Sequence, residues 1–139
     1  MPTLKTVKGK TATDRRELGR ILSPIRADGR NVSMLEDVSY YPHDGKDRIW
    51  QFGMHRGHIE MAVDGLGYET YTVTPPVWKK YFRMATGADK EASRALAMAR
   101  FPHHADLFRR VKDDGRAEAA LIALYALETI FGLQTITAV

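Results

Sequence analysis

Two short apolar segments, each bounded by turn signals, place the strongest constraint on how this chain folds. Residues 32–38 and 69–73 have the length and the apolar or β-branched content of buried strands. Helical patterns surround them, at residues 13–24, 50–66, 77–82, 89–101 and 113–131, with a basic, irregular or briefly helical stretch at 103–112. The first twelve residues contain few apolar side chains, so we expect a loop there. This order of elements predicts an α/β fold with a small parallel sheet.

Length and composition restrict the class of protein. A chain of 139 residues has the size of one domain, so we expect residues 1–139 to form a single domain. Hydrophobic residues make up 44% and charged residues 27%, which excludes a disordered polar tail. No signal peptide and no membrane-spanning segment is visible, which predicts a cytoplasmic protein of a bacterium or a phage-infected cell, without a membrane partner.

The content of ionisable residues narrows the chemistry. There is no cysteine, which excludes disulfides, zinc–thiolate sites and thiol nucleophiles. The five histidines show no metal-ligand spacing, and we assign none of them to a metal. The formal net charge of +4 permits a polyanionic partner but does not require one.

Acidic residues occur at two places where a carboxylate could do chemistry. In a strand over residues 32–38, Glu36 would share a face with Val32 and Met34, and a carboxylate on such a face must be paired or bind a metal. The alternative is that Glu36 lies at the solvated end of the strand. Asp113, Asp114 and Glu118 begin the last helix, where favourable interaction with the helix dipole is a sufficient explanation by itself.

Several blocks of the sequence, in the same order, closely resemble RuvC-like Holliday junction resolvases of phage and bacterial genomes, to which the chloroplast resolvases of plants look related. The blocks are residues 34–38 (MLEDV), 52–53 (FG), 73–80 (VTPPVWKK), 87–94 (GADKEASR), 106–108 (DLF) and 112–125 (KDDGRAEAALIALY). The resemblance implies an RNase H-like fold, with a mixed sheet flanked by helices. It also implies a homodimer that cuts branched DNA, such as a four-way junction, using Mg²⁺ or Mn²⁺ held by carboxylates.

The resemblance assigns catalytic and metal-binding roles to acids at both places. Glu36 matches the acid of the inner strand, and Glu118 matches the acid of the last helix. Asp113 matches the acid that opens the last motif, but Asp114 is adjacent and could serve instead. Asp114 and Glu118 are four residues apart, so they would share one face of a helix.

The resemblance also implies residues that contact DNA. Lys79, Lys80 and Lys90 match positions expected to meet phosphates, although lysines exposed to solvent need no such role. Tyr40 and Tyr41 follow the strand that carries Glu36, where aromatic rings could stack on unpaired bases. Trp50 could do the same or could pack in a core.

One departure from the family pattern bears on activity. The family begins with a hairpin whose first strand carries an Ile-Asp-Pro-Gly-like motif, and this chain contains no Asp-Pro pair. The chain therefore looks as if it begins at the end of the third strand, with residues 1–4 as the loop that leaves it. We expect it to cut DNA weakly or not at all and to self-associate through an open strand edge or the helix at 50–66.

Two other interpretations of the sequence stay open. The chain could be a non-catalytic DNA-binding remnant of a resolvase, which keeps the basic residues without a working metal centre. It could also be an unrelated small α/β interaction protein whose acids coincide with the family pattern. In that last case Glu36 and Glu118 would lie far apart.

Overall fold

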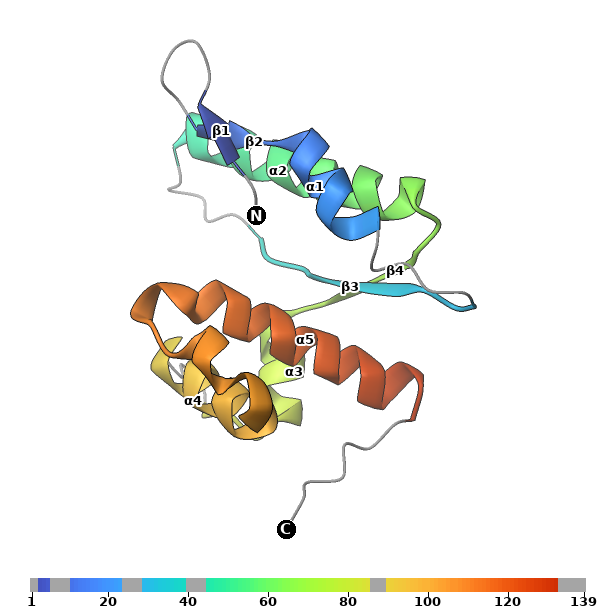
Figure 1. The fold of residues 1–139 in the computed structure, drawn as a ribbon. Helices are drawn as coiled ribbons and strands as arrows, with labels where there is room; N and C mark the ends of the chain where they lie inside the picture. The colour runs from blue at the N-terminus through green and yellow to red at the C-terminus, as the bar shows by residue number, and fades with distance from the viewer. Residues whose placement is uncertain (1–2, 6–10, 24–28, 40–44, 86–89, 133–139) are drawn as a thin grey trace. The chain divides into compact units, whose positions relative to one another are not determined.

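The computed structural model describes residues 3–5, 11–23, 29–39, 45–85 and 90–132, and the chain divides into two compact units (Figure 1). Unit 1 comprises Met1–Ser33 and Ser39–Tyr71, and unit 2 comprises Met34–Val38 and Thr72–Val139. The single-domain assignment remains a prediction, and the two units are described separately below.

Unit 1 begins with a hairpin that the sequence did not suggest. Strands β1 (Thr3–Lys5) and β2 (Thr11–Thr13) pair antiparallel, with Thr3 opposite Thr13. The prediction that the first twelve residues form a loop was therefore wrong at both strands, including residues 3 and 4 of the loop expected at 1–4, whereas residues 1, 2 and 6–10 lie outside the described residues. Threonine is β-branched and favours strands, a signal that the low apolar content of this segment concealed.

Two helices complete the description of unit 1. Helix α1 (Arg15–Leu22) begins after Asp14, whose carboxylate accepts a hydrogen bond from the Glu17 backbone N–H at 3.1 Å. It packs on α2 (Lys46–Gly65), which starts four residues before the predicted helix. Trp50 is 69% exposed on α2, so the expectation that it could pack in a core was wrong. Within the described ranges, no helix is both long and apolar enough to cross a membrane.

Strands β3 (Val32–Glu36) and β4 (Glu69–Val73) pair with each other, and each contributes residues to both units. The Glu69 N–H donates to the Asn31 carbonyl at one end, and the Asp37 N–H donates to the Val73 carbonyl at the other, both at 2.8 Å. Because residue numbers rise in the same direction along both strands, the pair is parallel, as predicted. The described residues form two two-stranded sheets, so the α/β class is confirmed, whereas the RNase H-like mixed sheet remains a prediction.

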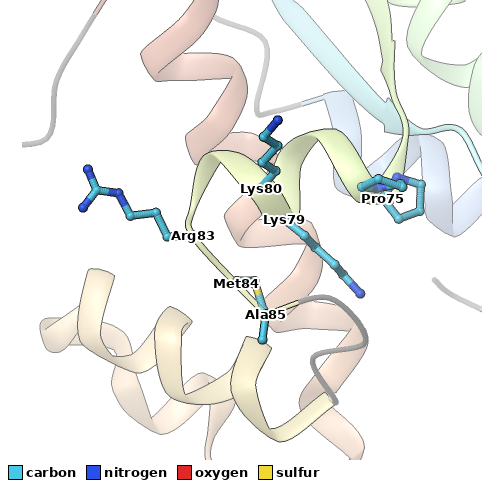
Figure 2. A pocket seen from close by; sticks show the side chains of 7 residues that line it. Pro75, Lys79, Lys80, Arg83, Met84 and Ala85 are labelled. Atoms are coloured by element: carbon cyan, nitrogen blue, oxygen red, sulfur yellow. The ribbon is translucent and has the colours of Figure 1, made fainter.

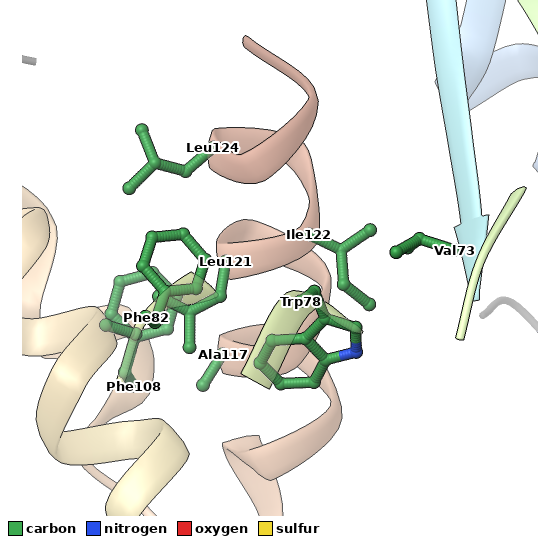
Figure 3. Packing of buried hydrophobic residues seen from close by; sticks show 9 residues of the cluster. Val73, Trp78, Phe82, Phe108, Ala117, Leu121, Ile122 and Leu124 are labelled. Carbon is green, nitrogen blue, oxygen red and sulfur yellow. The ribbon is translucent and has the colours of Figure 1, made fainter. Parts of the chain in front are cut away.

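Unit 2 is built around its last helix. Its elements are α3 (Pro75–Tyr81), α4 (Lys90–Arg100), the 3₁₀ segments Pro102–Phe108 and Val111–Asp113, and α5 (Asp114–Ile130). These positions confirm the predicted helices to within two residues at most ends. Trp78 and Leu121 are completely buried, and Figure 3 shows them with other members of the apolar cluster around α5. This core fixes α3 and α4 against α5.

Candidate functional site

Glu36 lies at the end of β3, where a buried tryptophan holds its carboxylate. The indole Nε1–H of Trp78 donates a hydrogen bond to Glu36 Oε1 at 2.8 Å. Trp78 belongs to α3, which follows β4 directly because Pro75 and Pro76 end the strand and suit the first turn of a helix. The packing of Trp78 in the core of unit 2 therefore sets the orientation of this acid.

Lys79 links the Trp78 side of the site to Glu118 on α5. Its ammonium nitrogen lies 5.3 Å from the centroid of the Trp78 ring and 3.8 Å from Glu118 Oε1. The Ser93 hydroxyl of α4 donates a longer hydrogen bond, of 3.4 Å, to the same Glu118 oxygen. Ser93 is completely buried. Glu36 and Glu118 thus both lie beside the Trp78–Lys79 pair, although they come from opposite ends of the sequence of unit 2.

Asp114 lies one helical turn before Glu118 on α5 and pairs with a second lysine. Lys90 Nζ lies 2.5 Å from Asp114 Oδ2. The hydrogen bond from Lys90 lowers the pKa of the Asp114 carboxyl below its ordinary value, and the Gly115 backbone N–H acts in the same direction. The pKa of Lys90 is raised, chiefly by its hydrogen bond to Asp114, and Glu118 adds to the electrostatic part of this rise. Lys90 therefore forms an ion pair with one acid of this helical face, Asp114.

Asp113, although adjacent to Asp114, has different partners. It is only 3% exposed, and its two carboxylate oxygens accept hydrogen bonds from Nε and a terminal nitrogen of Arg110 at 3.0 and 2.9 Å. The Arg110 backbone N–H donates to it as well, at 3.1 Å. The side-chain hydrogen bonds from Arg110 lower the pKa of Asp113 to about 2, although burial acts in the opposite direction. Its carboxylate fastens the turn before α5.

Replacing Asp113 with asparagine is expected to lower the thermal unfolding midpoint by several degrees at pH 7. The pKa of Asp113 is lower in the folded chain than its ordinary value of 3.8, so its stabilisation is complete above that value and is lost as the pH falls through about 2. The difference between wild type and Asp113→Asn should therefore shrink between pH 5 and pH 2, as measured by circular dichroism. Asp106→Asn is the matched control, because Asp106 pairs with Arg109 at the same spacing but is exposed. An equal effect of both substitutions would contradict the structural role of Asp113.

A pocket of about 510 Å³ lies beside Lys79 (Figure 2). Lys80 and Arg83 also line it, while Lys90 belongs to the acidic face described above.

Sequence reasoning missed Trp78, Ser93 and Arg83. Trp78 and Ser93 fall inside the blocks 73–80 and 87–94 that carried the resemblance, and this position was the signal available for them. Tyr40 and Tyr41 lie outside the described residues.

The acids of the site match a divalent cation in the chemistry of their donor atoms. Carboxylate oxygens are the donors that Mg²⁺ and Mn²⁺ prefer, so the donor chemistry of Glu36, Asp114 and Glu118 suits such an ion. However, the described residues contain no group of three or more histidine, aspartate or glutamate side chains arranged to hold a metal. The type of donor atom therefore suits such an ion, but the described residues do not bring three such side chains together.

Comparison with known proteins gives one informative similarity. No family model matches the chain. The chain is 34% identical, over 111 residues, to the chloroplastic Holliday junction resolvase MOC1 of Chlamydomonas reinhardtii. The alignment covers 75% of this chain, which spans only 12% of the length of that relative. The similarity supports a relationship to Holliday junction resolvases.

Proposed function

We propose that this chain is a nuclease of the Holliday junction resolvase kind, which binds branched DNA and hydrolyses its phosphodiester bonds with the help of Mg²⁺ or Mn²⁺. The observation that carries the proposal is that Glu36 accepts a hydrogen bond from Trp78 while Glu118 lies 3.8 Å from the ammonium group of the next residue, Lys79. Asp114 lies one turn from Glu118. The similarity to a resolvase names the same class of substrate. An RNase H-like fold of the RuvC type is part of this proposal.

Each residue of the site would have a separate role in binding the cation. The Trp78 N–H orients the carboxylate of Glu36, and the hydrogen bond from Lys90 lowers the pKa of the Asp114 carboxyl. Ionised, oriented carboxylates are the ligands that a divalent cation needs. When bound, such an ion would polarise the attacking water and stabilise the leaving oxygen. We place Asp113 outside this set because its oxygens are already committed to Arg110.

Basic side chains would hold the DNA backbone beside these acids. Lys79 and Lys90 lie next to carboxylates, and Lys80 is exposed at the pocket. Lysine binds phosphate without reading sequence, so contacts of this kind would position DNA rather than select a base. We also propose that Tyr40 and Tyr41 stack on unpaired bases, as expected from their place after β3.

We further propose that the functional unit is a homodimer formed through α2. Trp50, Met54, Gly57 and Met61 follow each other at spacings of four, three and four residues, so they share one face of this helix. The three apolar side chains of this set are exposed, Met61 by 74%. A Cβ built on Gly57 meets no neighbouring atom, so a second helix could approach closely there.

Replacing Met61 with glutamate is expected to convert the dimer to a monomer, since it places a charge in the apolar face of α2. Sedimentation velocity at tens of micromolar would report the change. Gln51→Glu, an exposed position on the same helix at the side of this face, adds the same charge and should leave the dimer intact. A wild-type chain that sediments as a monomer would contradict the dimer.

The function is tested with a labelled four-way junction and a duplex of the same sequence. We expect tighter binding of the junction than of the duplex. Because the chain lacks the Asp-Pro motif of the family, we expect at most weak nicking of the junction, which requires Mg²⁺ and stops with a chelator. Junction binding without metal-dependent nicking would instead support the second candidate, a non-catalytic DNA-binding protein. The incomplete ligand group among the described residues favours that candidate. No preference for the junction would overturn both.

A further inference from the structure

The pocket beside α3 combines positive charge with an apolar lining. Its lining residues are Pro75, Pro76, Lys79, Lys80, Arg83, Met84 and Ala85. Three of the seven are cations and none is an acid, and Figure 2 shows these side chains projecting from α3 and from the turn after it. A volume of about 510 Å³ lies in the range of small-ligand sites. The pocket therefore suits an anion with an attached apolar group.

Arg83 occupies a backbone position that favours glycine. Its φ is +55°, and among the described residues it is the one non-glycine residue with a positive φ. The Arg83 N–H bonds the Lys80 carbonyl and the Met84 N–H bonds the Lys79 carbonyl, both at 2.9 Å, as in the usual left-handed ending of a helix. Because an arginine side chain is disfavoured in this conformation, its presence destabilises the turn slightly.

The Arg83 side chain is exposed and makes no hydrogen bond or ion pair within the described part of the chain. The same holds for Lys80. Lys79 differs, since it lies near Glu118. On the wall of the basic pocket, the Arg83 guanidinium is therefore available to a ligand that binds there.

We propose that this pocket binds one unpaired nucleotide of a DNA strand, with its phosphate between Arg83 and Lys80 and its base against Pro75, Pro76 and Met84. This inference rests on the proposed function, because branched DNA supplies unpaired nucleotides. Guanidinium and ammonium groups bind phosphate, and a base has an apolar face that can lie on proline and methionine side chains. Lys79 belongs both to the pocket and to the acidic site, which would place the bound strand near Glu118.

The first test separates binding from folding. Arg83→Gly is expected to weaken binding of a short oligothymidylate about tenfold, measured by fluorescence anisotropy, and to lower the salt dependence of log K by about one. The thermal midpoint should stay the same or rise, because glycine suits the left-handed turn. Lys112→Gln removes an exposed cation of the same unit outside the pocket and should change binding less. Unchanged binding by Arg83→Gly would overturn the proposal, and so would a loss equal to that of Lys112→Gln.

The second test observes the pocket itself. With methionine methyl groups labelled by ¹³C, thymidine monophosphate should shift the signal of Met84 and leave that of Met61 on α2 unchanged. Inorganic phosphate should shift Met84 less, and an equal shift would overturn the role of the base. Failure of the proposed function would show as a wild-type chain with no preference for a junction, whereas failure of the pocket would leave that preference intact and Met84 unmoved.

Discussion

Glu118→Gln is expected to weaken binding of Mn²⁺ at least about tenfold and to remove any metal-dependent nicking of a four-way junction. Glutamine keeps the size of the side chain and one oxygen that can still accept the Ser93 hydrogen bond. It removes the negative charge that a divalent cation requires and that faces Lys79. Binding of the junction itself should not fall, because the substitution makes the site less repulsive to phosphate.

The matched control is Glu91→Gln, which makes the same chemical change at an exposed position on α4. Calorimetric titration with Mn²⁺ and gel analysis of the nicked junction give the two measurements. Equally tight binding of Mn²⁺ by Glu118→Gln and Glu91→Gln would contradict a metal-binding role of Glu118. A matching loss of Mn²⁺ binding in Asp114→Asn, but not in Asp113→Asn, is the corresponding expectation for the two adjacent aspartates.

Leu121→Ala is expected to lower the free energy of unfolding of unit 2 by about 2–5 kcal/mol. Leu121 is completely buried in the cluster around α5, so truncation removes apolar contacts and leaves a cavity. Leu107→Ala removes the same atoms from a side chain that is 47% exposed, and it should cost well under half as much. The comparison thus separates burial in the core from the loss of a leucine in general.

The two tryptophans allow this measurement to be made on one unit at a time. Trp78 lies in unit 2 and Trp50 in unit 1, and the sequence contains no third tryptophan. In a Trp50→Phe background, urea unfolding followed by tryptophan fluorescence therefore reports on unit 2. Equal losses for Leu121→Ala and Leu107→Ala would contradict the assignment of the core.

Elements with a strong local pattern were predictable from the sequence. Strand β4 was predicted with its observed bounds, because β-branched residues precede a Pro-Pro pair that ends the strand. Helix α5 was predicted from its apolar periodicity, and its start at Asp114 was within one residue of the prediction. The hairpin of β1 and β2 was missed because strands of three residues contain too few alternating positions to register as a pattern.

The arrangement of the site depended on contacts that no local pattern contains. The sequence does not distinguish Asp113 from Asp114. In the structure they differ because Arg110 donates hydrogen bonds to both carboxylate oxygens of Asp113. The hydrogen bond between Trp78 and Glu36 joins residues 42 positions apart, and Ser93 reaches Glu118 from another helix. The acids could therefore be named as candidates from the sequence, whereas their hydrogen-bond partners could be identified only from the folded structure.

If acids from β3 and α5 bind a divalent cation beside Trp78, as we propose, the ion will change the indole N–H signal of Trp78 and not that of Trp50. The Trp78 N–H donates to Glu36, whereas Trp50 is exposed on α2 in the other unit. Substoichiometric Mn²⁺ is expected to broaden the Trp78 signal selectively, and Glu118→Gln should remove that effect. A Trp78 signal that stays sharp, or that broadens no more than the Trp50 signal, would contradict the claim.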